Sequence, residues 1–303
     1  MPRLPQGVLA IIPAVFAMAL TDAIFKSWSA GISLWQIWVL RSLVVLPVLY
    51  VMAGGRVRVA GAGWIALRCL ALILMYLTMY PALPLIDMSL AGAAFYTAPL
   101  FIAGLSALVL GQRIAGLQWL AILVGFAGLL LIVRPFGLAF TPIILLPVAA
   151  AFCYACAAVL TRAKCMGAEP VVMGFWLNVA FLVTGGIAAA LLQSGLTLRG
   201  VDFPFLLATW QPLAPADWAV ILFLAVLMTG VSIGVAHAYK SPQPAVIATL
   251  EYAYMIFAIF WGFVFFSEVP DLWTILGMAL IATGGAAVLL VPTRPSQARA
   301  VAT

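Results

Sequence analysis

Long apolar runs follow one another along nearly the whole chain, and short stretches containing glycine, proline or charged residues separate them. Most runs are close to the roughly 20 residues that an α-helix needs to cross the hydrocarbon core of a membrane. The short alternating segments typical of transmembrane β-strands do not occur. The pattern therefore predicts an all-α integral membrane protein with ten transmembrane helices. The predicted spans are 7–27, 32–53, 64–84, 88–110, 116–133, 142–161, 171–193, 217–237, 243–266 and 273–291.

The amino-acid composition supports a membrane protein and limits the kinds of partner to be expected. Charged residues make up only 7% of the 303 residues, and 67% are hydrophobic. A soluble domain carries about 25% charged residues, so soluble enzymes, disordered proteins and disulfide-rich secreted domains are excluded. The net charge of +6 does not indicate a nucleic-acid partner, because the basic residues lie mainly in the links between apolar runs. The expected partners are a lipid bilayer and a small-molecule substrate, with the chain a monomer or weak oligomer.

The 14 lysines and arginines predict the orientation, because cytoplasmic links are enriched in these residues. With the N-terminus in the cytoplasm, four of them fall on the outer side or its helix ends, namely Lys26, Arg41, Arg134 and Arg199. The others fall on the cytoplasmic side. Both termini are therefore expected in the cytoplasm, which requires an even number of spans.

The two halves of the chain show weak internal similarity over several spans. Residues 16–26 (FAMALTDAIFK) can be laid on residues 152–162 (FCYACAAVLTR), since both segments are rich in alanine, begin with phenylalanine and end in a cation. Farther along, a single offset of 156 residues pairs Tyr96 with Tyr252, Gln112 with Glu268, and Gly128 with Gly284.

These matches predict two repeats of five spans each. The first repeat covers residues 7–135, the second covers residues 142–291, and residues 292–303 form a cytoplasmic tail. Because five is odd, the second repeat must insert upside down relative to the first. Inverted duplications of this kind are typical of secondary transporters, in which two bundles move about a central site.

Two stretches in each half carry a family resemblance. In the first half they are AGAAFYTAPLFIAGLSALVLGQ (91–112) and GLQWLAILVGFAGLLLIVRP (116–135). In the second half they are AVIATLEYAYMIFAIFWGFVFFSE (245–268) and GMALIATGGAAVLLV (277–291). On these stretches the chain resembles the ten-helix EamA branch of the drug/metabolite transporter superfamily, which includes bacterial exporters of amino acids, aromatic amino acids among them. The resemblance implies export of small metabolites across the inner membrane by alternating access.

Four positions compare directly with the family pattern. Pro99 matches a mid-helix proline in span four, and Glu268 matches a glutamate at the end of span nine. Gln112 replaces the expected glutamate of the first half, and Met255 replaces the proline of the second half. The two repeats are therefore expected to bend differently, and Pro99 is assigned a structural or gating role.

Ionisable groups inside the spans are the main charged candidates, because such a group costs about 2.5–3.5 kcal/mol at mid-helix. Arg41 can hold a substrate carboxylate, or it can join Asp22 and Lys26 in a structural ion cluster between the first two spans. Asp22 and Lys26 are accordingly assigned structural or gating roles. Glu251 in span nine can bind a substrate ammonium group, exchange a proton, or pair with a cation on another helix.

Aromatic residues are the second group of candidates. Tyr76, Tyr80 and Tyr96 lie deep enough in spans three and four that their hydroxyls need partners or water, which favours a role in lining a central cavity. Trp176, near the start of span seven, is a weaker candidate for the same wall. Aromatic walls with few charges suit a small amphipathic substrate. His237 is the only histidine and ends span eight, where a structural or gating role is expected.

Enzyme signatures are weak. The segment 230–234 (GVSIG) matches the GxSxG nucleophile elbow, but it lies in an apolar helical run and also reads as a GxxxG packing face. HExxH, P-loop and dinucleotide fingerprints are absent, so no catalytic residue, cofactor or metal site is predicted. The expected function is secondary export of amino acids and related metabolites. Transport of another small metabolite, nucleoside-like or cofactor-like, is an alternative, and a membrane-embedded enzyme is a remote one.

Overall fold

The chain is a multi-pass α-helical membrane protein. The computed structural model describes residues 6–29, 31–111, 116–134, 141–195, 203–238 and 250–290. Within these ranges, seven helices are long and apolar enough to cross a membrane, and three further apolar helices are shorter. A helix lies at each predicted span, and the all-α membrane class is confirmed. Gln112 and the tail at 292–303 lie outside the described residues.

The helices follow the predicted order. The first half contains α1 (Gln6–Trp28), α2 (Leu34–Met52), α3 (Ala62–Met79), α4 (Met88–Phe95), α5 (Ala98–Leu110) and α6 (Gly116–Val133). The second half contains the 3-10 turn η1 (Pro142–Ile144), α7 (Leu145–Lys164), α8 (Pro170–Gln193), the short α9 (Pro204–Leu207), α10 (Pro215–Ala238), α12 (Ala253–Phe266) and α13 (Leu272–Leu290).

The predicted fourth span, 88–110, is interrupted in its middle. Helix α4 ends at Phe95 and α5 begins at Ala98, with Tyr96 and Thr97 in a turn between them. Pro99 causes this break, because it has no N–H to donate to the carbonyl four residues earlier and its ring crowds that carbonyl. The predicted span at 88–110 is confirmed as a segment long and apolar enough to cross a membrane, Met88–Val109, and it is interrupted beside its proline.

The ninth predicted span has an interruption at the matching place. Leu250 is helical, Glu251 and Tyr252 form a turn, and α12 begins at Ala253. Met255 stands where the first half has its proline, so the sequence alone predicts a different bend here. The two spans are nevertheless both broken beside the paired residues Tyr96 and Tyr252.

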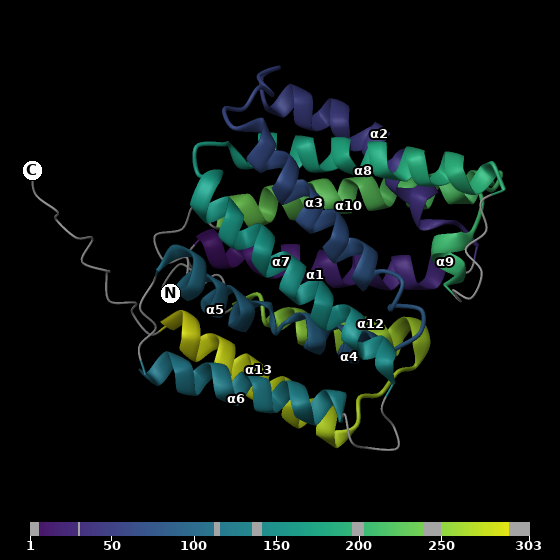
Figure 1. Cartoon of the computed structure of the whole chain (residues 1–303). Helices are drawn as coiled ribbons and strands as arrows, with labels where there is room; N and C mark the ends of the chain where they lie inside the picture. The colour runs from purple at the N-terminus through teal and green to yellow at the C-terminus, as the bar shows by residue number, and fades with distance from the viewer. Residues whose placement is uncertain are drawn as a thin grey trace, which may run out of the picture.

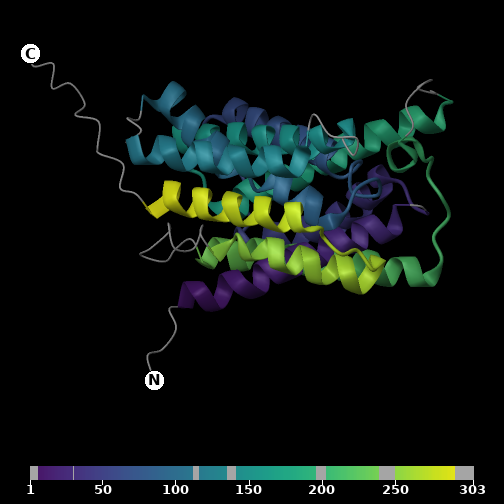
Figure 2. The same cartoon turned by 90° about the horizontal axis from the view of Figure 1, so that it is seen from below.

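Neighbouring helices pack in a crossed arrangement that joins the two halves of the chain (Figure 1). Helix α2 packs along α8, and α6 packs along α13. Helix α3 packs against α7, and α10 packs against α1. Helix α12 contacts α1 and α4, while α5 contacts α7. The start of α1 and the end of α13 lie at the same end of the bundle, as an even number of crossings requires (Figure 2).

Burial divides the side chains between an interior and an outer apolar surface. One buried cluster includes Phe25, Trp38 and Phe181, and a second surrounds the breaks beside Tyr96 and Tyr252. Many large apolar side chains on the outer helices are exposed, Leu108 being 83% exposed. Exposure of apolar side chains on this scale is appropriate for a surface that faces lipid rather than water.

The closest helix crossing lies between α6 and α13 and depends on glycine. A Cβ atom placed on Gly128 would lie 2.6 Å from the carbonyl oxygen of Gly277, and one placed on Gly277 would lie 2.7 Å from the carbonyl oxygen of Gly128. Small residues allow helix backbones to approach in this way within a membrane. Both glycines are therefore required for the observed crossing.

We expect Gly128→Ala to destabilise the protein by about 1–3 kcal/mol, because the added methyl group forces two packed backbones apart. Thermal unfolding of the purified protein in detergent would measure the loss. Gly104→Ala is the matched control, since a Cβ atom on this α5 glycine meets nothing within 4 Å. Equal unfolding midpoints for the two variants would contradict the assignment.

Candidate functional site

Arg41 is the most unusual side chain in the interior. It lies on α2, is only 1% exposed, and has its guanidinium carbon 4.8 Å from the centre of the Phe181 ring. Its Nε and Nη1 have no hydrogen-bond partner, and it forms no ion pair with a carboxylate among the described residues. A buried cation without its counter-charge is costly. The charge of Arg41 is therefore not compensated by a carboxylate in the part of the chain that the structure describes.

Aromatic rings surround this guanidinium and continue away from it. The ring of Phe181 lies 4.7 Å from that of Trp38 and 5.1 Å from that of Tyr76. Tyr76 is stacked at 5.2 Å on Tyr80. Both tyrosines are near enough to interact electrostatically with Arg41. We call this group the Arg41 cluster: Trp38, Arg41, Tyr76, Tyr80 and Phe181.

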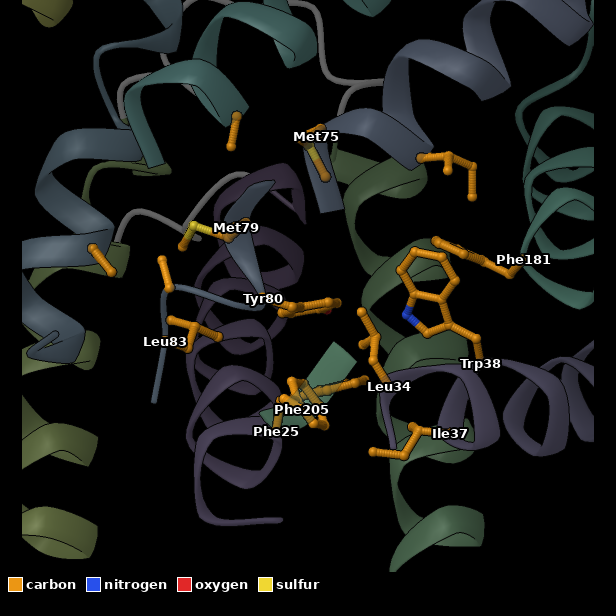
Figure 3. Close-up of a cluster of buried hydrophobic side chains, with 14 of the residues drawn as sticks. Phe25, Leu34, Ile37, Trp38, Met75, Met79, Tyr80, Leu83, Phe181 and Phe205 are labelled. Carbon is orange, nitrogen blue, oxygen red and sulfur yellow. The ribbon is translucent and has the colours of Figure 1, made fainter. Parts of the chain in front are cut away.

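Figure 3 labels three members of the cluster, namely Trp38, Tyr80 and Phe181. Phe181 lies next to Trp38, and Tyr80 lies beside Phe25. The rings of Tyr80 and Phe25 stack at 4.3 Å with an angle of 7° between their planes. The indole Nε1 of Trp38 is buried without a described hydrogen-bond partner. The cluster thus offers an unpaired indole N–H beside an unpaired guanidinium, and both groups are donors.

Asp22 provides a carboxylate on the neighbouring helix α1. The hydroxyl of Tyr254 donates a hydrogen bond to its Oδ2 at 2.5 Å. The Tyr254 ring reaches this place by lying directly on Gly92, where an added Cβ atom would lie 2.8 Å from the ring. Tyr76 and Tyr80 are near enough to interact electrostatically with both Asp22 and Arg41.

The two helix breaks meet beside Asp22. Tyr96 is stacked at 5.1 Å on Tyr254, and it lies 5.6 Å from Tyr252. Glu251 is close enough to Tyr252 to interact with it electrostatically. We call Asp22, Tyr96, Tyr252 and Tyr254 the Asp22 cluster. Discontinuous helices of this kind form substrate sites in many transporters, because their turns release backbone polar groups inside the bundle.

Lys26 does not pair with Asp22, the partner that the sequence suggests for it in an ion cluster. Its Nζ forms an ion pair with Glu268, just after α12, and donates to the carbonyl oxygen of Ile86 at 2.6 Å. The second oxygen of Glu268 accepts a hydrogen bond of 2.7 Å from the backbone N–H of Met88, the first residue of α4. We call this the Lys26–Glu268 network. It joins the ends of α1, α4 and α12.

The predicted charged residues therefore do not share one ion cluster. Lys26 is paired with Glu268, Asp22 accepts from Tyr254, and Arg41 has no carboxylate partner among the described residues. Lys26 and Asp22 thus have separate partners, and neither of them neutralises the guanidinium of Arg41.

Two other predicted residues lie away from the clusters. Trp176 donates from its Nε1 to the carbonyl oxygen of Val57 at 2.8 Å, so its polar group tethers α8 to the link between α2 and α3. His237 belongs to α10, but its side chain lies outside the described part of the structure. The structure therefore brings together Arg41 with Tyr76 and Tyr80, and Tyr96 with the turn that holds Glu251.

Sequence analysis does not select four of the residues that complete these clusters. Phe181 and Trp38 lie in largely apolar spans, where nothing in the sequence distinguishes a ring that packs on a cation from an ordinary core ring. Tyr252 and Tyr254 follow Glu251 by one and three residues. Three hydroxylated or charged residues so close together within an apolar span are the signal that identifies this turn.

Comparison with known proteins identifies the class of this site. Residues 5–134 match the model of the EamA-like transporter family, a family of the drug/metabolite transporter superfamily. This first half is similar to an EamA-like transporter domain. A transporter, and not an enzyme, is the class of function that this similarity supports.

More distant similarity extends over nearly the full length. The pseudopaline exporter CntI of Pseudomonas aeruginosa, from strains UCBPP-PA14 and PAO1, is 24% identical over 283 residues, which cover 92% of this chain and 94% of the relative. The crystal structure of another protein superposes with a TM-score of 0.60 at 19% identity, covering 93% of this chain and 95% of that one. The structural likeness supports the fold alone.

The Lys26–Glu268 network predicts strong coupling between its two charges. The two side chains are only 9% and 12% exposed, so Lys26→Met or Glu268→Gln should each cost about 3 kcal/mol by leaving one buried charge unpaired. The double variant should lose less than the sum of the two. Thermal unfolding in detergent measures all three, and additive losses would contradict the coupling.

Arg134→Gln is the matched control for these three variants. Arg134 pairs with Asp271, but these side chains are 31% and 49% exposed, so the loss should stay below about 1 kcal/mol. The hydrogen bond from Arg134 lowers the pKa of Asp271 to about 2. Its small stabilisation is therefore present above the ordinary carboxyl pKa and is lost as the pH falls toward 2.

Proposed function

We propose that this protein is a secondary transporter that exports amino acids and related small zwitterionic metabolites across the inner membrane by alternating access. The observation that carries the proposal is Arg41, a buried guanidinium with two unpaired nitrogens inside an aromatic enclosure. A substrate carboxylate would supply the missing counter-charge, and guanidinium groups bind carboxylates through paired hydrogen bonds.

The remaining groups suit the other end of such a substrate. Asp22 and Glu251 are carboxylates that can receive an ammonium group, and Tyr76, Tyr80 and Tyr96 provide aromatic surface between the charges. Only one cation, Arg41, is buried in the two clusters, which disfavours a substrate with several negative charges. A zwitterion requires one cation and one anion, and the two clusters provide both.

Alternating access requires two similar bundles, and two aromatic pairs support an inverted repeat. Phe16 and Phe257 pack edge to face at 5.2 Å and 88°, and Phe101 and Phe152 pack at 5.7 Å and 89°. The repeat pairs Phe16 with Phe152 and Phe101 with Phe257. Exchanging each residue for its repeat partner therefore turns the Phe16–Phe257 contact into the Phe152–Phe101 contact.

The crossing of α6 and α13 supports the same symmetry. An offset of 156 residues pairs Gly128 with Gly284 and Ala121 with Gly277. This offset converts the close approach of Gly128 and Gly277 into one between Gly284 and Ala121. A Cβ atom on Gly284 would indeed lie 2.6 Å from the carbonyl oxygen of Ala121. The repeats at 7–135 and 142–291, with ten spans and cytoplasmic termini, are the organisation that we infer.

The proposed transport cycle uses the clusters in a defined order. Substrate binds between Arg41 and the carboxylates while the end of the bundle at the Lys26–Glu268 network is closed. When the Lys26–Glu268 network breaks, the ends of α1, α4 and α12 separate. The site then opens toward that end of the bundle, from which the substrate leaves. Pro99 and the turn at Glu251 and Tyr252 allow each broken span to bend while its outer segment keeps its packing.

Export is the direction supported by the relatives, whose names describe exporters of pseudopaline. The identity of the cargo does not carry over at 24% identity. Nucleoside-like and cofactor-like metabolites remain the alternative cargo on the same fold. The amino-acid assignment depends on the charge pattern of the two clusters.

Counterflow in liposomes tests the proposal. Purified full-length protein would be reconstituted with an internal mixture of unlabelled amino acids, and uptake of labelled phenylalanine, threonine and lysine would be followed. Arg41→Gln should lower saturable uptake about tenfold or more, because a hydrogen bond to a charged group contributes about 1.5–3 kcal/mol. Glu251→Gln and Tyr96→Ala should also lower it.

Two controls make this test specific. Arg134→Gln removes the same charge outside the clusters and should retain uptake. Arg41→Lys keeps the charge but loses the planar fork, so uptake should fall even though the cation remains. Folded protein that shows no counterflow of any amino acid would overturn the cargo, and unchanged uptake by Arg41→Gln would overturn the role of Arg41.

Cysteine labelling tests the proposed orientation. In a background with the native cysteines replaced by alanine, Thr209→Cys, between α9 and α10, should react with a membrane-impermeant maleimide added to intact spheroplasts. Met166→Cys, in the link between α7 and α8, should react only after lysis. Both positions are exposed, so the side of the membrane on which each lies decides whether the reagent reaches it. The reverse pattern would invert the topology.

A further inference from the structure

A pocket of about 800 Å³ lies apart from the two clusters, at the end of the bundle where α2 and α7 finish. Its walls come from the link between α2 and α3 and from the link between α7 and α8, with apolar residues such as Val59 and Val172 among them. The hydrogen bond from Trp176 to Val57 fastens the first link to α8. The pocket is therefore built by two links that are fixed to the same helix.

Positive charge is concentrated in this pocket. Arg56, Arg58 and Lys164 line it, and Glu169 is the one acidic residue among the described residues of its wall. Among the described residues, none of these four takes part in an ion pair. Three cations against one carboxylate leave two positive charges for a ligand to neutralise.

The rim of the pocket continues into the lipid-facing surface. Lys164 lies 5.2 Å above the ring of Trp64, which is 43% exposed, as is Met52 on the pocket wall. Met166, in the link between α7 and α8, is 76% exposed. Tryptophan and lysine are typical of the depth at which lipid headgroups lie. A ligand in the pocket can therefore place a charged group on the arginines and an apolar part along the helices.

We propose that this pocket binds the phosphate headgroup of an anionic phospholipid, whose acyl chains lie along the exposed apolar side chains beside Met52 and Trp64. Arg56 and Arg58 hold the phosphate oxygens, and Lys164 adds a third positive charge. Basic pockets between membrane helices select anionic headgroups by this combination of charge and enclosure. The lipid joins the α2–α3 link to the α7–α8 link, one from each of the proposed repeats. In the orientation inferred above, it comes from the cytoplasmic leaflet.

Native mass spectrometry of the full-length protein, delipidated in detergent, tests this site. Phosphatidylglycerol and phosphatidylcholine with identical acyl chains would be added at matched concentrations. We expect about tenfold tighter binding of phosphatidylglycerol, given the attraction of basic groups for anionic headgroups. Changing Arg56, Arg58 and Lys164 together to glutamine should abolish this preference, whereas Arg56→Lys with Arg58→Lys should keep most of it.

Arg162→Gln is the matched control. Arg162 is exposed two residues from Lys164 at the same end of α7, but it does not line the pocket. A preference lost equally in this variant would show general surface attraction and overturn the site, as would equal binding of the two lipids. Displacement of phosphatidylglycerol by millimolar inorganic phosphate would assign the pocket to free phosphate instead. Should the triple variant not fold, Arg58→Gln alone should reduce the preference about threefold, and an unchanged preference would overturn the proposal.

Discussion

Hydrocarbon offers no hydrogen bonds, so every backbone polar group at membrane depth must find a partner inside the protein. This constraint explains why the two helix breaks lie where they do. The turns at Tyr96 and Thr97 and at Glu251 and Tyr252 are enclosed by rings from other helices, and Tyr96 contacts Tyr252 across the centre. Irregular backbone is tolerated there because protein rather than lipid covers it. The candidate site is located at the same place because those turns bring polar groups inside the bundle.

The same constraint applies to the buried charged groups, which differ in the partners that stabilise them. Lys26 is neutralised by Glu268, and Asp22 is stabilised by the hydroxyl of Tyr254. Arg41 has only rings and no carboxylate among the described residues. Two of these charges are satisfied within the protein, and the third is the one that the proposed function assigns to a substrate carboxylate. The similarity to EamA-like transporters agrees with that assignment.

Sequence periodicity predicts the helices well because the length and polarity of a membrane span are local properties. It also identifies Arg41, Tyr76 and Tyr80 as unusual residues, since each is a polar or charged group inside an apolar run. The choice of partner is not local. Lys26 is separated from Glu268 by 242 residues, and the sequence offers nearby Asp22 as an equally reasonable partner. Packing of α1 against α12 decides between them, and no pattern within a single span contains that information.

The break before α12 shows a second limit. Met255 in place of a proline predicts that the two repeats bend differently, yet both spans are interrupted beside the paired tyrosines. Gly285 contributes to this, because a Cβ atom there would lie 1.5 Å from the Tyr252 hydroxyl. Only a glycine leaves room for that side chain, so α13 helps to set the conformation of the turn. A helix break imposed from a neighbouring helix cannot be predicted from the residues of the broken helix.

The bond between Asp22 and Tyr254 has a consequence for recognition. The offsets that relate the two halves pair Asp22 with Ala158 and Tyr254 with Ala98, so the symmetric position carries two methyl groups in place of a carboxylate and a phenol. In the inverted repeat that we propose, the polarity at the centre is therefore one-sided. A molecule with unlike ends can then lie in only one of the two directions that the scaffold alone would allow. In the proposed repeat, this unlike pair of positions would give a bound molecule one preferred orientation.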